Sequence, residues 1–306
     1  MIRNVAKLIA LLAAIEASEY AGAATLDLSK PEDVIAAEIR LGCAPDPKHP
    51  RLSVNQGSVY SHRAGEPDRH LFDVLGLTTR ACEVMRDPKR GPGYRAVGRE
   101  IMFFIDLASR DILESWLNPW TAERVEVLHM LNDPTSMAQP RYAFSAEREP
   151  EARWTGTIVE GLAVSRRTQP FFRDNPLGGP YQDFIGGKYH VLESSTDVVP
   201  VASWLDTSVP SASRGVSSWT RISPWLPWMK MGDREGLIVI TSYWTSVGSL
   251  DALPEPLRGR VRADFPQFAE APPFDDRRPF VYSWIYYRQQ IDARRTAAPA
   301  EPSRAP

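Results

Sequence analysis

The sequence of 306 residues has few of the residues that build metal or redox centres. Its only cysteines are Cys43 and Cys82, and no two of its five histidines are spaced two or four residues apart. Two separated thiols do not make a tetrahedral zinc site, and histidine ligands would have to converge from separate strands. We therefore expect no bound metal. The two thiols are expected either to stay unpaired and buried or, if the chain is exported, to form one disulfide.

The sequence also lacks a block of like charge and an apolar run long enough to cross a membrane. It carries 36 basic and 38 acidic residues, for a net charge of −2, and 43% of its residues are apolar. Nucleic-acid-binding proteins normally present a basic face, so nucleic acid is not an expected partner. The apolar run Leu8–Ile15 is too short to span a bilayer. The composition is typical of a soluble protein that buries a core.

The common cofactor and nucleophile motifs are missing as well. The chain contains no G-x-G-x-x-G, no P-loop, no H-E-x-x-H and no G-x-S-x-G sequence. We therefore expect no cofactor. The chain is instead rich in proline (27 residues) and tryptophan (nine residues). This composition indicates loops punctuated by proline and either an aromatic core or an aromatic-lined pocket.

The N-terminus has the three parts of a secretory signal peptide. Basic residues Arg3 and Lys7 precede the apolar run, and the A-x-A site Ala21–Ala23 follows it. An amphipathic helix that packs on the domain is the alternative. Residues 1–23 are thus predicted to be a cleaved signal for the periplasm or secretion, whereas a retained N-terminus would indicate a cytoplasmic protein.

The rest of the chain predicts a mainly β fold. Short apolar or alternating segments are separated by Gly, Pro, Asn and Asp turns at intervals typical of an antiparallel meander. We expect the meander to have at least eight strands and to close into a calycin- or lipocalin-like barrel or to form a strongly curved sheet. The expected strands are 57–63, 71–74, 78–85, 94–105, 112–117, 124–131, 154–165, 189–194, 198–205, 217–222, 237–247 and 280–287.

Helices are expected only at the periphery, at 27–40 and 250–268. No stretch resembles an interdomain linker. Residues 24–290 are therefore interpreted as one β-rich domain, followed by a disordered tail at 291–306.

One region resembles a known family. The matching pieces are Arg99-Glu100, Trp116, Asn118-Pro119-Trp120-Thr121, His129 and Asn132-Asp133-Pro134, with Leu26–Glu32 and Gly57–Tyr60 upstream. They resemble the DUF1838 family, a bacterial and fungal group named for its unknown function, over about Asp27 to Tyr287. The turn Asp106–Asp111 departs from the glycine-containing turn that is usual in the family. The resemblance implies a role in breaking down aromatic, lignin-derived compounds, including side-chain lyase steps that release formaldehyde.

His129 is the first candidate for a catalytic residue. It alternates with Val125, Val127 and Leu131 on one face of an expected strand, two residues before a carboxylate-bearing turn. An inward histidine there is suited to general acid–base catalysis, and His129→Ala would then lower turnover by about 10² or more. A core histidine bonded to a backbone carbonyl is the alternative. Asp133 is expected to orient it, to act itself, or only to form the turn.

Glu100 is the second candidate. Alternation places it on one strand face with Met102 and Phe104, and places Arg99 on the other face with Phe103. An inward carboxyl group needs a partner or a raised pKa. A structural ion pair is the alternative to a catalytic role.

The stretch Ser218–Met231 carries three tryptophans and two methionines. It is expected to wall a flat aromatic ligand, to form a hydrophobic lid, or both. Arg221 or Lys230 would then hold a phenolate or carboxylate. The expected substrate-binding residues are Tyr60, His62, Trp116, Trp120, Asn132, Trp219, Trp225, Trp228 and Tyr243.

Together these residues predict a cofactor-independent lyase or dehydratase for a hydrophobic, aromatic small molecule. His129, Asp133 or Glu100 would transfer protons, and Arg221 or Lys230 would stabilise negative charge. The first alternative is a lipocalin-like carrier, whose pocket needs few ionisable groups. The second is a structural or interaction module, which would present an exposed apolar patch and no deep pocket.

Overall fold

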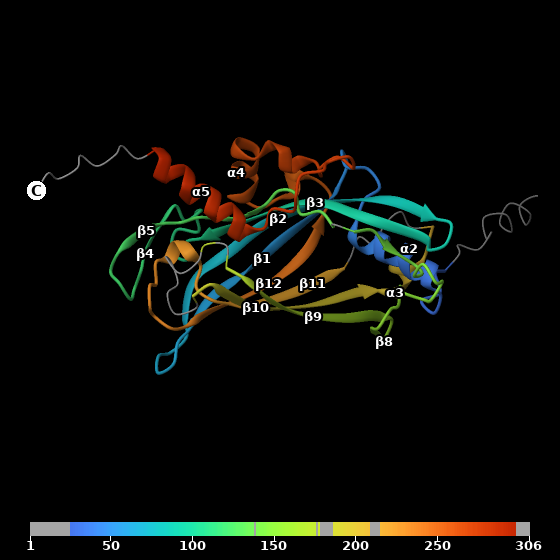
Figure 1. Cartoon of the computed structure of the whole chain (residues 1–306), viewed down its shortest axis with the longest axis horizontal. Helices are drawn as coiled ribbons and strands as arrows, with labels where there is room; N and C mark the ends of the chain where they lie inside the picture. Colours follow the sequence, from blue (N-terminus) through green and yellow to red (C-terminus); the bar gives the residue numbers. More distant parts are fainter. Residues whose placement is uncertain (1–24, 138, 176, 178–185, 209–214, 298–306) are drawn as a thin grey trace, which may run out of the picture.

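The computed structural model describes residues 25–297, except 138, 176, 178–185 and 209–214. The predicted signal peptide at 1–23 and the end of the predicted tail at 298–306 lie outside the described residues. Within the described part of the chain, one large antiparallel sheet dominates, and helices lie around it (Figure 1).

The strand order of the large sheet is β6-β3-β2-β1-β12-β11-β10-β9-β8, with β7 also paired to β3. These strands are β6 (Met130–Asn132), β3 (Gly91–Ile105), β2 (Arg69–Asp87), β1 (Arg51–His62), β12 (Leu237–Val247), β11 (Val216–Ser223), β10 (Lys188–Pro200), β9 (Leu162–Asp174), β8 (Thr157–Val159) and β7 (Arg141–Tyr142). A separate two-stranded sheet contains β4 (Ser115–Leu117) and β5 (Arg124–Glu126).

The helices are short. They are α2 (Pro31–Gly42), α3 (Val201–Leu205), α4 (Leu257–Asp264) and α5 (Ser283–Ala297), with the 3₁₀ turns η2 (Pro227–Met229), η3 (Leu250–Ala252) and η4 (Pro266–Ala269). The helix predicted at 27–40 is α2, which begins at Pro31. Its first turn carries this proline and the acidic Glu32 and Asp33, which lie beside its positive end. No helix in the described part is long and apolar enough to cross a membrane.

The sheet is strongly curved, and its two faces have different covers. On the convex face, Leu52, Val54 and Leu77 pack with Leu257 and Val261 of α4. The concave face is filled at one end by an aromatic core that joins both limbs of the sheet. Its large buried members are Phe72, Phe104, Trp116, Trp225, Trp228, Met229, Met231, Trp284 and Tyr287. The remainder of the concave side is hollow.

The prediction of a mainly β, antiparallel fold is confirmed. The end strands β6 and β8 are not paired with each other in the described sheet, so closure into a barrel is not confirmed. The predicted strand at 280–287 is wrong, because α5 begins at Ser283. Trp284 and Tyr287, three residues apart, turn toward the concave core as helical spacing requires. The disordered tail predicted from residue 291 is likewise wrong as far as Ala297.

Several other predicted strands differ from the structure. The segments 71–74 and 78–85 belong to one strand, β2, the segment 112–117 is a strand only in β4, and the segment 154–165 is divided between β8 and β9. The segment 124–131 is split between β5 and β6, and residues 127–129 between them are not in a strand. The segment 198–205 ends in α3 rather than continuing as a strand. Cys43 and Cys82 form a disulfide between the end of α2 and β2, which settles the alternative left open by the sequence.

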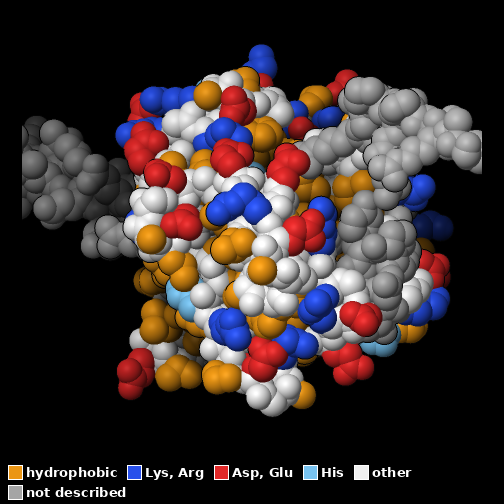
Figure 2. Space-filling view, turned by 90° about the vertical axis from the view of Figure 1, so that its left-hand side faces the viewer, with side chains coloured by type: hydrophobic (Ala, Val, Ile, Leu, Met, Phe, Trp, Pro, Cys, Tyr) orange, Lys and Arg blue, Asp and Glu red, His pale blue; other side chains and the backbone are white. Residues whose placement is uncertain are grey.

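Figure 2 shows the end of the molecule that lies on the left of Figure 1. Acidic and basic side chains are interspersed there, and neither sign gathers into a continuous field. This mixture agrees with the small net charge of the chain.

Candidate active site

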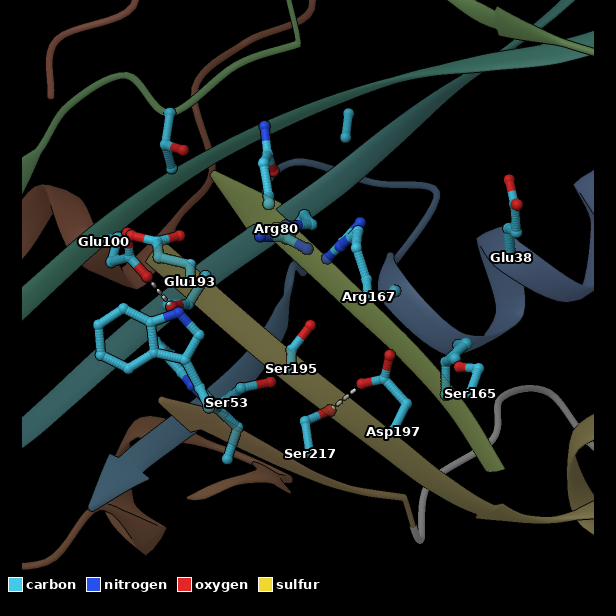
Figure 3. A pocket seen from close by; sticks show the side chains of 18 of the residues that line it. Glu38, Ser53, Arg80, Glu100, Ser165, Arg167, Glu193, Ser195, Asp197 and Ser217 are labelled. Atoms are coloured by element: carbon cyan, nitrogen blue, oxygen red, sulfur yellow. Dashed lines mark hydrogen bonds between the residues drawn. The ribbon is translucent and has the colours of Figure 1, made fainter. Parts of the chain in front are cut away.

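A cavity of about 1160 Å³ occupies the hollow part of the concave side. Side chains from β1, β2, β3 and β6 line it on one limb of the sheet, and those from β9, β10, β11 and β12 line it on the other. Residues from α2 and the start of α5 complete the walls. The curvature of the sheet therefore brings together residues that are more than a hundred positions apart in the chain (Figure 3).

Strand register explains which side chains face this space. Glu100 on β3 is paired with Asn132 on β6 and with Thr78 on β2, and Thr78 is paired with Ser53 on β1. Paired residues point to the same face of a sheet, so these four form one polar row. On the opposite limb, Glu193 on β10 is paired with Arg221 on β11.

The hydrogen-bond partners of Glu100 among the described residues are uncharged side chains. The Asn132 amide donates a hydrogen bond of 2.7 Å to Oε2, and the Thr78 hydroxyl lies 3.4 Å from Oε1. Burial raises the pKa of Glu100 above its ordinary value, and the charge of Glu193 raises it further, whereas the Asn132 hydrogen bond and the charge of Arg80 oppose this. The surroundings of Glu100 thus raise its affinity for a proton, which is the direction that suits a general acid.

Glu193 lies across the cavity from the β3 strand, with its carboxyl group near that of Glu100 (Figure 3). Arg221 donates a hydrogen bond of 2.6 Å to Glu193, and a second guanidinium nitrogen donates to the Tyr189 hydroxyl. The arginine side chain is only 12% exposed. The site therefore holds one carboxyl group with an arginine partner beside another without one.

The environments of two neighbouring carboxyl groups commonly assign them opposite acid and base roles. Glu100 is the group whose environment favours a bound proton. Glu193 is ion-paired with Arg221, so a cation already lies beside the group that would accept a proton. This arrangement suits an acid–base pair in which Glu100 gives a proton and Glu193 accepts one.

Aromatic side chains border these polar groups. Trp219, Trp244 and Trp284 line the cavity, together with Phe171 and Tyr282. The guanidinium of Arg173 lies 5.0 Å from the ring centre of Phe171 and 4.8 Å from that of Tyr282. Flat apolar walls with a few charged groups are typical of sites for small aromatic ligands.

The structure brings together four of the residues singled out in the sequence: Glu100, Asn132, Trp219 and Arg221 all line this cavity. The prediction that Glu100 and Arg99 face opposite sides is confirmed. Arg99 leaves the cavity and binds Asp133 at 3.1 Å and the backbone oxygen of Gln267 at 2.7 Å.

His129 is not among the cavity residues. Its Nδ1 accepts a hydrogen bond of 3.2 Å from the Phe104 backbone N–H, and its ring contacts those of Phe103 and Phe104. Burial and the charge of Arg260 lower the pKa of His129 to about 3. The chain leaves the strand at 127–129, so the alternation used to aim His129 inward does not apply there. The imidazole is a neutral core group that caps a backbone N–H.

Asp133 and Lys230 also lie outside the cavity lining. Asp133 accepts hydrogen bonds from Arg99 and from Arg278, both at 3.1 Å. Lys230 pairs with Glu123 at 3.0 Å on the surface. Both charges are used in ion pairs outside the cavity lining.

The remaining predicted binding residues are dispersed. Four of them belong to the aromatic core at the filled end of the concave side: Trp116, Trp120, Trp225 and Trp228. Tyr60 stacks on His70, and His62 pairs with Asp68. Tyr243 is 46% exposed on the outer face. The residues that follow β11, Trp225 to Met231, therefore contribute core packing. Of the three tryptophans in Ser218–Met231, only Trp219, which lies within β11, lines the cavity.

Sequence reasoning missed Tyr189, Glu193, Trp244, Trp284 and Arg80. A signal for two of them existed, since strand alternation in the predicted segment 189–194 places Tyr189 and Glu193 on one face. Trp284 was missed because its segment was assigned to a strand. No group of three or more metal-ligating side chains is placed to hold an ion in the described ranges.

Comparison with known proteins agrees with the resemblance seen in the sequence. No curated protein matches this chain. The model of the DUF1838 family, described as a protein of unknown function, matches residues 51–291. This range includes Glu100, Glu193 and Arg221 and most of the chain. The protein therefore belongs to the DUF1838 family.

Proposed function

We propose that this protein is a cofactor-independent lyase or dehydratase that acts on an aromatic small molecule inside the concave cavity. The observation that carries the proposal is the placement of Glu100, whose pKa is raised, beside Glu193, which is paired with Arg221. An acid–base pair of this kind moves protons without a cofactor. Trp219, Trp244 and Trp284 provide the walls for aromatic rings.

The chemistry that fits these groups is redox-neutral. In a 1,3-diol flanked by aromatic rings, Glu193 accepts the proton of the primary hydroxyl, and the adjacent carbon–carbon bond breaks to release formaldehyde. The electron pair of that bond forms a carbon–carbon double bond as the benzylic hydroxyl leaves as water, protonated by Glu100. The products are an alkene, formaldehyde and water. Arg221 stabilises negative charge during proton removal.

A lipocalin-like carrier with a closed barrel is the alternative proposal. The size of the cavity suits either function. The ionisable groups favour the enzyme, because a carrier for hydrophobic compounds has no need of two neighbouring carboxyl groups, one of them unpaired with a cation. An interaction module is disfavoured by the presence of a large cavity.

The proposal is tested by incubating the protein with a panel of lignin-derived dimers that carry such a side chain. Mass spectrometry should detect loss of formaldehyde plus water, or of water alone, from at least one compound. Binding of these compounds without turnover would favour the carrier instead.

We further propose that the chain is exported. The Cys43–Cys82 disulfide supports this location, because disulfides persist mainly in oxidising compartments. N-terminal sequencing of the mature protein should begin near residue 24. A mature chain that begins at Met1 or Ile2 would contradict export.

A further inference from the structure

The cavity has an excess of positive charge. Its described lining contains eight arginines and four carboxyl groups, although the whole chain carries slightly more acidic than basic residues. Two of the arginines are used in ion pairs, Arg141 with Glu38 and Arg221 with Glu193. Three more arginines donate hydrogen bonds to backbone or hydroxyl oxygens, and a fourth packs on aromatic rings. The last two arginines have neither kind of contact with the described residues.

These two are Arg80 on β2 and Arg167 on β9. Neither guanidinium forms a hydrogen bond or an ion pair with any residue that the structure describes. Figure 3 shows that they come from opposite limbs of the sheet and point toward one another across the cavity. Two converging guanidinium groups without a carboxylate between them form a ready site for a planar anion.

A third arginine adds positive charge beside this site. Arg51 on β1 is directly paired with Arg80 in the strand register, and like charges at opposite positions of a sheet repel one another. Arg51 is held by hydrogen bonds of 3.2 Å to the Arg40 carbonyl and 2.7 Å to the Ser246 hydroxyl. Burial lowers the pKa of Arg51, and the charge of Arg80 lowers it further. A bound anion would offset this repulsion.

The distance between Arg80 and Glu100 limits the length of a ligand that reaches both. Arg80 follows Thr78 by two residues on the same face of β2, and Thr78 is paired with Glu100. Two residues along a strand span about 7 Å. This separation is comparable to the length of one para-substituted aromatic ring. An anionic group held at Arg80 would therefore lie one ring away from the bond presented to Glu100.

We propose that the cavity recognises an aromatic carboxylate, with the carboxylate bound between Arg80 and Arg167. This inference rests on the proposed use of the cavity for an aromatic ligand and narrows the substrate class to compounds that carry a carboxylate about one ring from the reacting bond. Arg51 acts as a positioning residue that supports the charge of the site.

The test compares 4-methoxycinnamate with its uncharged analogue 4-methoxycinnamamide by isothermal titration calorimetry. Arg80 and Arg167 are both exposed residues on the rim of the cavity. The wild-type protein should still bind the carboxylate at least about tenfold more tightly, because hydrogen bonds between two charged groups are about twice as strong as those to a neutral amide. Arg80→Gln and Arg167→Gln should each reduce the preference, and the double variant should abolish it while retaining its affinity for the amide.

Arg86→Gln is the matched control. Arg86 lies on the same strand as Arg80, is exposed, and is absent from the cavity lining, so its replacement should leave the preference unchanged. Arg80→Gln should not lower the melting temperature, since it removes the repulsion with Arg51. This second measurement shows that a lost preference does not come from unfolding.

Each result has a separate meaning. Equal affinity of the wild-type protein for both compounds, or an undiminished preference in the double variant, overturns the carboxylate site and leaves the proposed lyase function standing. Failure of both compounds to bind the wild-type protein would contradict the aromatic cavity itself.

Discussion

Glu100 is the single side chain on which the proposed chemistry most depends. Replacing it with glutamine keeps its size and an acceptor oxygen for Asn132 but removes the transferable proton. We expect Glu100→Gln to lower turnover by about 10²–10⁴, the usual contribution of a general acid, with little change in ligand affinity. Glu83→Gln is the control, because Glu83 pairs with Arg95 outside the cavity lining. Equal turnover in the two variants would remove Glu100 from the mechanism.

The raised pKa of Glu100 also predicts a pH dependence of stability. A carboxyl group that binds its proton more tightly in the folded state stabilises the fold below its ordinary pKa of 4.5, and this stabilisation is lost as the pH rises through the raised value. The free energy of unfolding of the wild-type protein should therefore fall, relative to Glu100→Gln, as the pH increases above 4.5. Urea denaturation at several pH values measures this difference, and a difference independent of pH would contradict the assignment.

His129 predicts the opposite dependence. Its pKa falls to about 3 in the folded state, from 6.5, so its contribution to stability is present above pH 6.5 and is lost as the pH falls toward 3. His129→Gln keeps an acceptor for the Phe104 N–H and should flatten the acid dependence of the unfolding free energy in this range. We expect turnover to be unaffected by His129→Gln, in place of the 10²-fold loss expected from the sequence, because the imidazole lies outside the cavity.

At the level of strands and helices, the sequence predicted strand bounds best where a segment of alternating apolar and polar residues lies between two glycines. β12 runs over Leu237–Val247, as predicted, between Gly236 and Gly248. The start of α5 was mistaken for a strand because Phe, Tyr, Trp and Val all favour strands in isolation. Its helical conformation is supported by packing of Trp284 and Tyr287 against the concave core, a contact that local sequence does not reveal.

The close approach of β1 to β12 depends on glycine at position 57. A Cβ atom added to Gly57 on β1 would lie 2.0 Å from the Thr241 carbonyl oxygen of β12, which is backbone and cannot move aside. We expect Gly57→Ala to lower the free energy of unfolding by about 1–3 kcal/mol or more, the range for overpacking. Gly248→Ala, where a Cβ meets nothing within 4 Å, should be close to neutral. Equal melting temperatures for the two variants would contradict this role of Gly57.

On the scale of the whole molecule, the disulfide joins the helix α2 to the sheet across 39 residues of chain. The double variant Cys43→Ala, Cys82→Ala should lose about 2–4 kcal/mol of stability, because the cross-link restricts the unfolded chain. A reductant should lower the melting temperature of the wild-type protein toward that of the variant and leave the variant unchanged. A wild-type melting temperature that does not respond to reductant would show that the bond is absent or does not stabilise the fold.

Only some residues of the candidate site could be predicted from the sequence. Glu100 and Asn132 were found because both lie in the stretch that carries the family resemblance, and Arg221 because it lies among tryptophans. Glu193 and Arg167 were not predicted. They lie on β10 and β9, which face β3 across the cavity only because the whole sheet curves. Strand alternation predicts the face of a residue, but not which distant strand lies opposite.

The most direct test of this account is a crystal structure of Glu100→Gln with bound substrate, using a compound turned over by the wild-type protein. We predict that its aromatic rings lie beside Trp219 and Trp284, that the reacting bond lies between residue 100 and Glu193, and that a carboxylate, where present, lies between Arg80 and Arg167. A ligand bound beside His129, or at any site outside the concave cavity, would contradict the central claim.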